Sequence, residues 1–450
     1  MPSNCLALGY VSSFNLRSQI SSREVQLLSR LQILGVGTDL ISDTYFKKVT
    51  ESTIFNSSVL NSADGCSPIS NSEPKLRVAI VAESFLPHVN GVTNSVLRTI
   101  EHLKKHGHEV SVIAPGPGDD VVGDVPVVRM GSFGFPGYDE LRIALPKKAL
   151  ESELKNIAPD VIHVAAPAVL GAWALKVAHK IDIPTVAIYQ TDIAGFARQY
   201  RLGATSPAVW KYIAAIHNKA DLTLAPSTAA VWDLRKNGVE NVVRWMRGVD
   251  NLKFNPEHRN EFLRHRFGAP DKVIVGFVGR LAREKQVERL AEVAALPGVS
   301  VVIVGDGPCR EKLERLIPAA HFTGFASGNE LSQLYASFDV FAHTGVDETF
   351  CQAVKEALAS GVPVVAPAAG GPLDLVQHGV NGFLWSPSRR DTFVESIREL
   401  VTSYSTRDVC AQNARPSVLD RTWGSVMSEL VGHYQAVTGG LSFAYQGVAS

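Results

Sequence analysis

The feature that most constrains this chain is an alternation of apolar strands with amphipathic helices, which runs through the sequence twice. Leu76–Val81 is an almost continuous apolar run, typical of a strand buried on both faces of a parallel sheet. The segment after it places Val96, Ile100 and Leu103 on one side of a helix. Repetition of this unit predicts a doubly wound α/β sheet. We expect further strands at Glu109–Ala114, Val161–Ala165, Thr185–Tyr189 and Leu222–Ala225, and a second series at Val273–Val278, Ser300–Val304, His321–Thr323, Val340–Ala342 and Val362–Ala366.

The two series predict two α/β domains. A connector rich in chain breakers, residues 247–256, separates them. We expect an N-terminal domain over residues 75–245, a C-terminal domain over 255–415 and a final helix over 420–437. Residues 1–74 are rich in serine and polar near their end, and we expect a poorly ordered extension with no assigned role.

Composition excludes several functional classes. The chain has 450 residues, more than one hydrophobic core usually serves. Its 44 basic and 44 acidic residues balance, so there is no overall basic excess of the kind that nucleic-acid binders carry. The five cysteines show no C-x-x-C spacing, and no apolar run reaches the length of a membrane span. These observations favour free thiols and a cytoplasmic location.

Residues 348–356 hold the most informative motif. A strand ends before them, and we expect a helix to begin near Thr349 and to end at Ser360. The N–H groups of Thr349, Phe350 and Cys351 would then lie in the first turn, where a helix binds phosphate. Glu348 would lie at the helix start and Glu356 two turns deeper. The alternative is that both acids are ordinary solvated helix residues.

Basic and glycine-rich loops follow two other predicted strands. Arg280, Arg283 and Lys285 follow the first strand of the second series, where they would suit a diphosphate. Gly91 follows the first strand of the first series and would allow a ligand close to the backbone. The sequence contains no D-x-D triplet, so we expect no metal ion on the diphosphate.

Two further motifs are less specific. Residues 305–308 read G-D-G-P, but Arg310 stands where a dinucleotide loop has its third glycine, which disfavours a nicotinamide dehydrogenase. Asp192 follows the strand that ends in Tyr189 and could orient or deprotonate a hydroxyl group. A structural role for this acid is the alternative.

Taken together, these motifs resemble the retaining glycosyltransferases of family 4. The resemblance covers roughly residues 76–437, and it implies the GT-B fold, in which two Rossmann-like domains face each other and a C-terminal helix crosses back. Within the family, the chain is most similar to bacterial GDP-mannose-dependent α-mannosyltransferases that act on glycolipids. The stretches that carry this similarity are residues 81–87, 189–192, 348–352 and 370–372.

The resemblance implies roles for matching residues. Arg280 and Lys285 would neutralise the donor diphosphate, with Gly91 beside it. Glu348 would hold hydroxyl groups of the transferred sugar, and Glu356 those of the ribose. The resemblance also assigns Thr349, Phe350 and Cys351 to donor binding and Phe325 to the base. Many family members have a histidine where this chain has Gln190, so no catalytic histidine is transferred, and Asp192 is the nearest candidate for handling the acceptor.

The implied function is transfer of mannose from GDP-mannose to a lipid or glycolipid acceptor in cell-envelope synthesis, with no metal cofactor. Aromatic residues in the 131–138 segment, together with Lys104 and Lys105, suggest peripheral contact with the inner face of the plasma membrane. Ordinary packing and solvated charge are the alternative. A UDP-sugar donor, a nucleotide-sugar epimerase and a non-catalytic sugar-nucleotide binding protein stay open.

Overall fold

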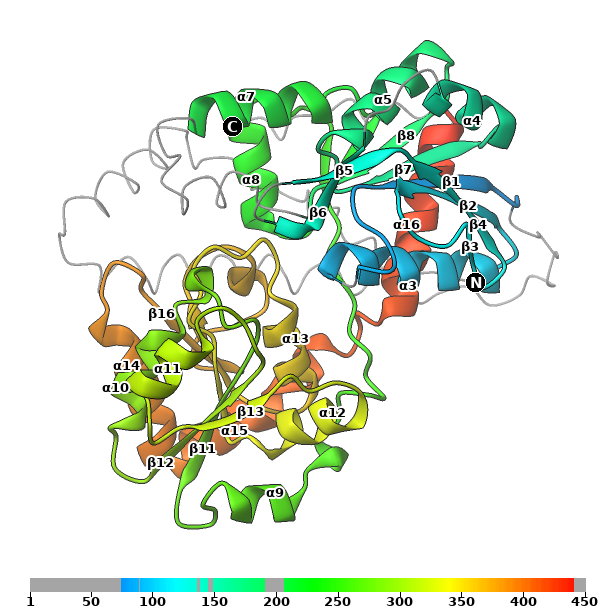
Figure 1. The fold of residues 1–450 in the computed structure, drawn as a ribbon. Helices are drawn as coiled ribbons and strands as arrows, with labels where there is room; N and C mark the ends of the chain where they lie inside the picture. The colour runs from blue at the N-terminus through cyan, green and yellow to red at the C-terminus, as the bar shows by residue number, and fades with distance from the viewer. Residues whose placement is uncertain (1–73, 89, 136–137, 145–148, 191–205, 441–450) are drawn as a thin grey trace, which may run out of the picture. The chain divides into compact units, whose positions relative to one another are not determined.

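A computed structural model describes residues 74–88, 90–135, 138–144, 149–190 and 206–440 (Figure 1). The expected N-terminal extension lies outside these residues, apart from Pro74. Most of the described chain forms two parallel α/β sheets, as the alternation of strands and helices predicts. Among the described helices, none combines the length and the hydropathy that a bilayer crossing requires.

The first sheet has eight strands in the order β10-β9-β8-β7-β1-β2-β4-β3, and only β3 runs antiparallel to its neighbour. Its central strand is β1 (Arg77–Ala82), which pairs with β2 on one side and β7 on the other. The other strands are β2 (Glu109–Pro115), β3 (Val121–Val122), β4 (Val125–Met130), β7 (Val161–Ala165), β8 (Thr185–Ile188), β9 (Leu222–Ala225) and β10 (Val242–Arg244). The associated helices are α3 (Gly91–Lys105), α4 (Ala149–Ile157), α5 (Leu170–Lys180), α7 (Ser206–His217) and α8 (Thr228–Lys236).

The second sheet has six parallel strands in the order β13-β12-β11-β14-β15-β16. These are β11 (Val273–Val278), β12 (Val299–Val304), β13 (His321–Gly324), β14 (Val340–Ala342), β15 (Val364–Pro367) and β16 (Gly382–Trp385). The α-helices of this half are α9 (Glu261–Arg266), α10 (Leu290–Ala294), α11 (Arg310–Leu316), α12 (Gly328–Ser337), α13 (Gln352–Ala359), α14 (Asp391–Thr402) and α15 (Tyr404–Ala414). Short 3-10 turns lie at 256–258, 283–285, 287–289, 371–374 and 416–418.

The last helix, α16 (Trp423–Thr438), packs on the first half of the chain, although it follows the second half in sequence. Figure 1 shows it in red beside α3, which it contacts. Leu430 is buried in the same hydrophobic cluster as β1, and the Tyr434 hydroxyl lies 2.6 Å from Nδ1 of buried His163. The expected crossing-back helix is therefore confirmed, with bounds shifted by a few residues from the predicted 420–437.

All ten predicted strands are present, with ends shifted by at most two residues. The β15 strand begins at Val364, not at Val362, because Pro363 has no N–H to donate to a neighbouring strand. The prediction missed β10, β16 and the segment between β2 and α4, which includes the antiparallel hairpin of β5 (Ser132–Phe135) and β6 (Tyr138–Ala144). The domain boundaries stay a prediction.

Candidate active site

A cavity of about 880 Å³ is lined by residues from both series of strands. This size suits a ligand as large as a nucleotide sugar. The first series contributes residues 90–92 and Gln190, and the connector contributes Arg247. The remaining lining comes from loops that follow β11, β12 and β14. These loops lie at carboxyl ends of parallel strands, where α/β proteins bind their ligands.

The centre of this cavity is an ion pair between Lys285 and Glu348. The Lys285 ammonium donates a hydrogen bond to Oε1 of Glu348. The backbone carbonyl of Lys285 accepts a hydrogen bond from the Thr344 hydroxyl, which ties the two loops together. Burial raises the pKa of Glu348, but the positive charges of Lys285 and His343 prevail and lower the pKa to about 2. Glu348 is therefore a carboxylate at neutral pH, with a cation already bound to it.

His343 approaches the same carboxylate from the end of β14. Its side chain is only 2% exposed, and its Nε2 atom lies 3.4 Å from Glu348 Oε1. Burial lowers the pKa of His343, whereas Cys351 and the Glu348 carboxylate raise it, with a net rise to about 9. A protonated imidazole would add a second positive charge next to Glu348.

Arg247 brings a cation from the connector into the same cavity. Its Nη2 atom donates to Oε1 of Gln190 at 2.5 Å. Burial lowers the pKa of Arg247 to about 10 and Glu348 opposes that shift, so the side chain stays charged at neutral pH. The bond to Oε1 turns the Gln190 amide nitrogen away, and this buried nitrogen has no hydrogen-bond partner among the described residues. With the exposed Arg280 and Arg283, the cavity holds an excess of positive charge that suits a polyanion such as a diphosphate.

The helix after Glu348 begins three residues later than predicted. α13 starts at Gln352, and its N-cap residue is Cys351, whose φ of 76° and ψ of 75° are left-handed. The preceding loop is set by the 370–371 turn, where the Gly371 N–H donates to the Glu348 carbonyl at 2.9 Å. Thr349, Phe350 and Cys351 are therefore not in the first turn. The first-turn N–H groups belong to residues 352–354 instead.

The structure brings together seven of the ten predicted site residues. The cavity is lined by Gly91, Arg280, Lys285, Glu348, Thr349, Phe350 and Cys351. Glu356 and Phe325 are not among its lining residues, and Asp192 lies outside the described residues. Phe325 is 78% exposed. Oε2 of Glu356 accepts a hydrogen bond from the Tyr335 hydroxyl at 3.1 Å, and burial raises the pKa of Glu356 to about 7 against the lowering effect of that bond.

The prediction of site residues missed Arg247 and His343, and it treated Gln190 only as a replacement for histidine. Arg247 lies beside Gly248 in a segment whose composition is typical of a linker, and His343 directly follows an apolar strand that was interpreted as structural. Arg247 could have been predicted from its position, because a charged residue between two α/β domains lies near the cleft where such proteins bind ligands. The side chains of His343, Glu348 and Cys351 offer ligand atoms within 4.8 Å of one another, but the Lys285 ammonium is bonded to that carboxylate.

Comparisons with known proteins agree with this architecture. The family model for Glycosyltransferase Family 4 matches residues 89–251, and the model for Glycosyl transferases group 1 matches residues 259–417. A GDP-mannose-dependent alpha-mannosyltransferase of Mycolicibacterium smegmatis is 49% identical over 81% of this chain and 98% of its own length. The sulfoquinovosyl transferase SQD2 of Arabidopsis thaliana is 34% identical over 93% of this chain and 86% of its own.

The fold itself matches solved structures. Anabaena Alr3699/HepE, crystallised with UDP and glucose, aligns with a TM-score of 0.63 at 22% identity, over 80% of this chain and all of that one. WaaG, a glycosyltransferase involved in lipopolysaccharide biosynthesis, aligns with a TM-score of 0.61 over 80% of this chain and all of its own. Two parallel sheets with a returning C-terminal helix are thus the arrangement expected of GT-B enzymes. The family models together cover well over half of the sequence, and the chain belongs to the family 4 glycosyltransferases.

Proposed function

We propose that this enzyme transfers mannose from GDP-mannose to a lipid-linked acceptor, with retention of configuration at the anomeric carbon. The 49% identity to a GDP-mannose-dependent alpha-mannosyltransferase over almost all of that protein supports the donor and the reaction. The observation that carries the proposal is the Lys285–Glu348 pair in a cavity that Arg247 and Arg280 also line. A site of this charge fits a sugar diphosphate without a metal ion.

In the proposed mechanism, Arg280 and Lys285 stabilise the departing diphosphate. Negative charge grows on the phosphate oxygen as the anomeric carbon–oxygen bond breaks and an oxocarbenium-like centre develops. Cations held in place before the reaction stabilise this charge without a reorganisation cost. The acceptor oxygen attacks the face that the diphosphate leaves, and a donor phosphate oxygen takes its proton. Arg247, which was absent from the predicted set, joins these two cations.

Acidic and amide groups would orient the sugars. We assign Glu348 to hydroxyl groups of the transferred sugar, since its carboxylate is ionised and lies in the cavity. The unpartnered amide N–H group of Gln190 supplies a donor for the same sugar or for the acceptor. Gly91 leaves room for the diphosphate, and the loop at Phe350 faces the donor.

The remaining assignments rest on the resemblance. We assign Glu356 to the ribose, Phe325 to the base and Asp192 to the acceptor. Glu356 and Phe325 do not line the cavity. Their assignment therefore requires the nucleoside to extend out of the cavity, past the first turn of α13. Single substitutions with GDP and mannose 1-phosphate as separate probes test which part of the donor each residue binds.

A donor screen tests the proposed function. The purified chain is incubated with GDP-mannose, UDP-glucose, UDP-galactose and a UDP-sulfoquinovose preparation, each with a lipid extract, and nucleotide release is measured. We expect GDP release to exceed UDP release, because the 49% identical relative is a GDP-mannose-dependent enzyme. Mass analysis of the lipids identifies the mannosylated product.

The second candidate is transfer of a sugar other than mannose, which the similarity to a sulfoquinovosyl transferase over 93% of the chain favours. A UDP-sugar donor is the form of this alternative that the screen tests. Predominant release of UDP would establish this alternative and refute GDP-mannose. Tight GDP-mannose binding without transfer to any lipid would instead indicate a non-catalytic binding protein.

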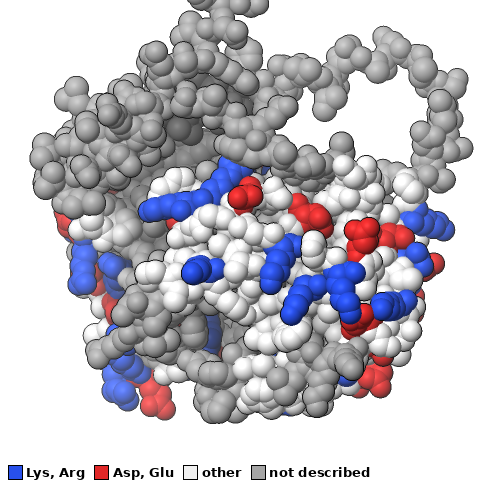
Figure 2. Space-filling view, turned by 90° about the horizontal axis from the view of Figure 1, so that it is seen from above, with Lys and Arg blue, Asp and Glu red and all other residues white. Residues whose placement is uncertain are grey.

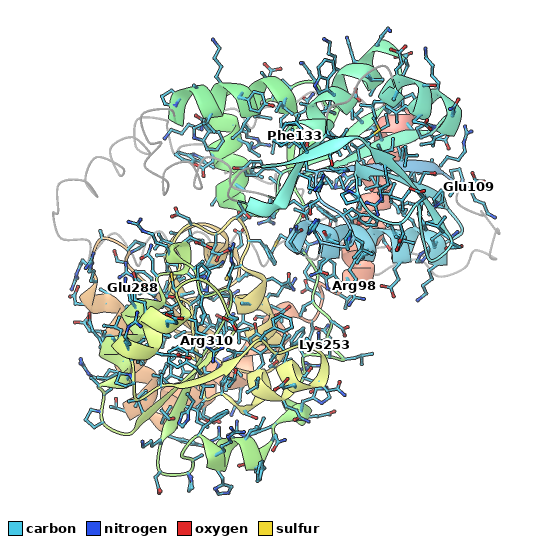
Figure 3. All side chains as sticks on the ribbon, viewed as in Figure 1. Arg98, Glu109, Phe133, Lys253, Glu288 and Arg310 are labelled. Carbon is cyan, nitrogen blue, oxygen red and sulfur yellow. The ribbon has the colours of Figure 1, made fainter. Side chains whose placement is uncertain are left out.

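The acceptor proposal includes contact with an anionic membrane on the cytoplasmic side. Phe133, on β5, is 46% exposed and labelled in Figure 3. Lys104 is bound to Asp124 at 2.7 Å, which leaves Lys105 as the less constrained of the two cations proposed for this contact. On the face seen from above in Figure 2, Lys and Arg side chains lie with Asp and Glu side chains among them.

Liposome flotation tests this contact. We expect the wild-type chain to float with vesicles that contain anionic lipid and to do so less when Phe133 is changed to serine. If the wild-type chain floats with neither anionic nor neutral vesicles, the proposed membrane contact is refuted.

A further inference from the structure

Lys355 carries a buried amine that the proposed reaction does not use. It lies on α13, seven residues after Glu348, and only 1% of it is exposed. Its ammonium donates to the backbone carbonyl of Arg247 at 2.6 Å and to that of Arg421 at 3.3 Å. No carboxylate among the described residues forms an ion pair with it. Burial lowers the pKa of Lys355 to about 7, with a further lowering by Arg421 and an opposite effect of Asp420.

The two carbonyls belong to the two segments that join the halves of the chain. Arg247 lies just after β10, the last strand of the first sheet, and Arg421 lies just before α16. These segments are themselves paired, since the Val249 N–H donates to the Arg421 carbonyl at 3.1 Å. Gln352, the first residue of α13, donates from Nε2 to the Gly248 carbonyl at 3.1 Å. The α13 helix therefore binds both segments that join the two halves of the chain, and the loop that contains Glu348 leads into the start of the same helix.

The Arg247 side chain leads from this junction into the cavity. Its guanidinium binds Oε1 of Gln190, and a Cβ atom on Gly91 would lie 3.9 Å from its Nη1. Because the side chain extends from a backbone unit whose carbonyl is bound by Lys355, movement of that unit would move the guanidinium. A buried amine without an acidic partner is costly to a protein. The hydrogen bonds of Lys355 to the two connector carbonyls offset part of that cost, and its Nζ also lies 5.8 Å from the centre of the Phe350 ring.

We propose that Lys355 is a positioning residue that fixes the Arg247 guanidinium in the donor cavity through the Arg247 carbonyl. This inference rests on the proposed function only because it takes a nucleoside diphosphate as the ligand. Lys355 does not contact the donor and acts through Arg247. A substitution of Lys355 should therefore have no effect on donor affinity when the Arg247 guanidinium is absent.

A double-mutant cycle on the full chain tests this dependence. Binding of GDP and of UDP is measured by calorimetry for the wild type, Lys355→Met, Arg247→Met and the double variant, and the cycle is evaluated with whichever nucleotide the wild type binds. We expect Lys355→Met to weaken binding about tenfold in the wild-type background and less than twofold in the Arg247→Met background, the non-additivity typical of coupled residues. Lys312→Met, at an exposed lysine of α11, is the matched control and should change nothing.

An equal loss of affinity in both backgrounds would show a general structural effect and overturn the proposal, as would unchanged affinity in Lys355→Met. If Lys355→Met does not fold, Lys355→Gln, whose amide keeps a donor, takes its place in the same cycle. A second readout needs no nucleotide: phenylglyoxal modification of Arg247, located by mass spectrometry, should be faster in the Lys355 variant than in the wild type. An unchanged rate would also contradict the proposal, whereas binding of neither nucleotide by the wild type would refute the proposed function alone.

Discussion

Replacement of Lys285 by methionine should remove most of the catalytic efficiency and leave the fold intact. Lys285 is a half-buried cation beside Glu348, with 24% of its side chain exposed. Two unit charges 4 Å apart interact by about 4 kcal/mol at an effective dielectric constant near 20. Partial exposure reduces the stabilisation of the departing diphosphate to roughly 3 kcal/mol, which corresponds to about a hundredfold loss in kcat/KM.

The assay is the initial rate of nucleotide release with GDP-mannose and a lipid acceptor, measured over a range of donor concentrations. Because the charge develops mainly in the transition state, we expect the larger part of the loss in kcat. Lys312→Met is the control for loss of a lysine from the same half of the chain. Circular dichroism and thermal unfolding check that the variant folds. A kcat/KM within fivefold of the wild type would refute the assignment of Lys285 to the leaving group.

Three other variants test the site and its support. Burial raises the pKa of Glu356 to about 7, so its carboxylate should be ionised, and able to accept hydrogen bonds from ribose hydroxyl groups, mainly above that pH. The ratio of GDP affinities between the wild type and Glu356→Gln should therefore increase from pH 6 to pH 8. A ratio that does not change with pH would contradict the ribose assignment. Gly371→Ala should lower the free energy of unfolding by about 3 kcal/mol in urea titrations, because a Cβ atom there would overlap the Phe350 backbone, and an unchanged value would rule out that close approach. Leu430→Ala should cost about 2–5 kcal/mol, since this side chain is buried where α16 meets the first sheet; a loss below 1 kcal/mol would mean that α16 contributes little to the fold.

The alternation of strands and helices was readable from the sequence because buried parallel strands are continuously apolar. Val273–Val278 and Val340–Ala342 are examples whose bounds agree with the structure residue for residue. Most of the missed strands lack that pattern, although the apolar β16 has it. β4 carries a proline and an arginine and is only partly buried, and the β5–β6 hairpin contains glycine and charged residues.

The start of α13 illustrates what local sequence cannot decide. Thr349 and Phe350 carry no feature that forbids a helix, and the prediction therefore began one there. The structure keeps them outside it because the Gly370–Gly371 turn, twenty residues later, packs its backbone against theirs and binds the Glu348 carbonyl. A contact of that range has no signature in the residues on either side of the helix start.

The sequence by itself determined the α/β architecture and the final helix, because both depend on periodicity, and it determined the family through short motifs. The return of the final helix to the first half of the chain followed only from the resemblance to that family. The sequence also predicted Arg280, Lys285 and Glu348 as site residues, since they follow recognisable strands, and the structure places all three in one cavity. Only the tertiary structure added Arg247 and Lys355. Arg247 lies in a connector and Lys355 on a buried helix face. The role of each depends on a hydrogen-bond partner more than fifty residues away, which local sequence does not indicate.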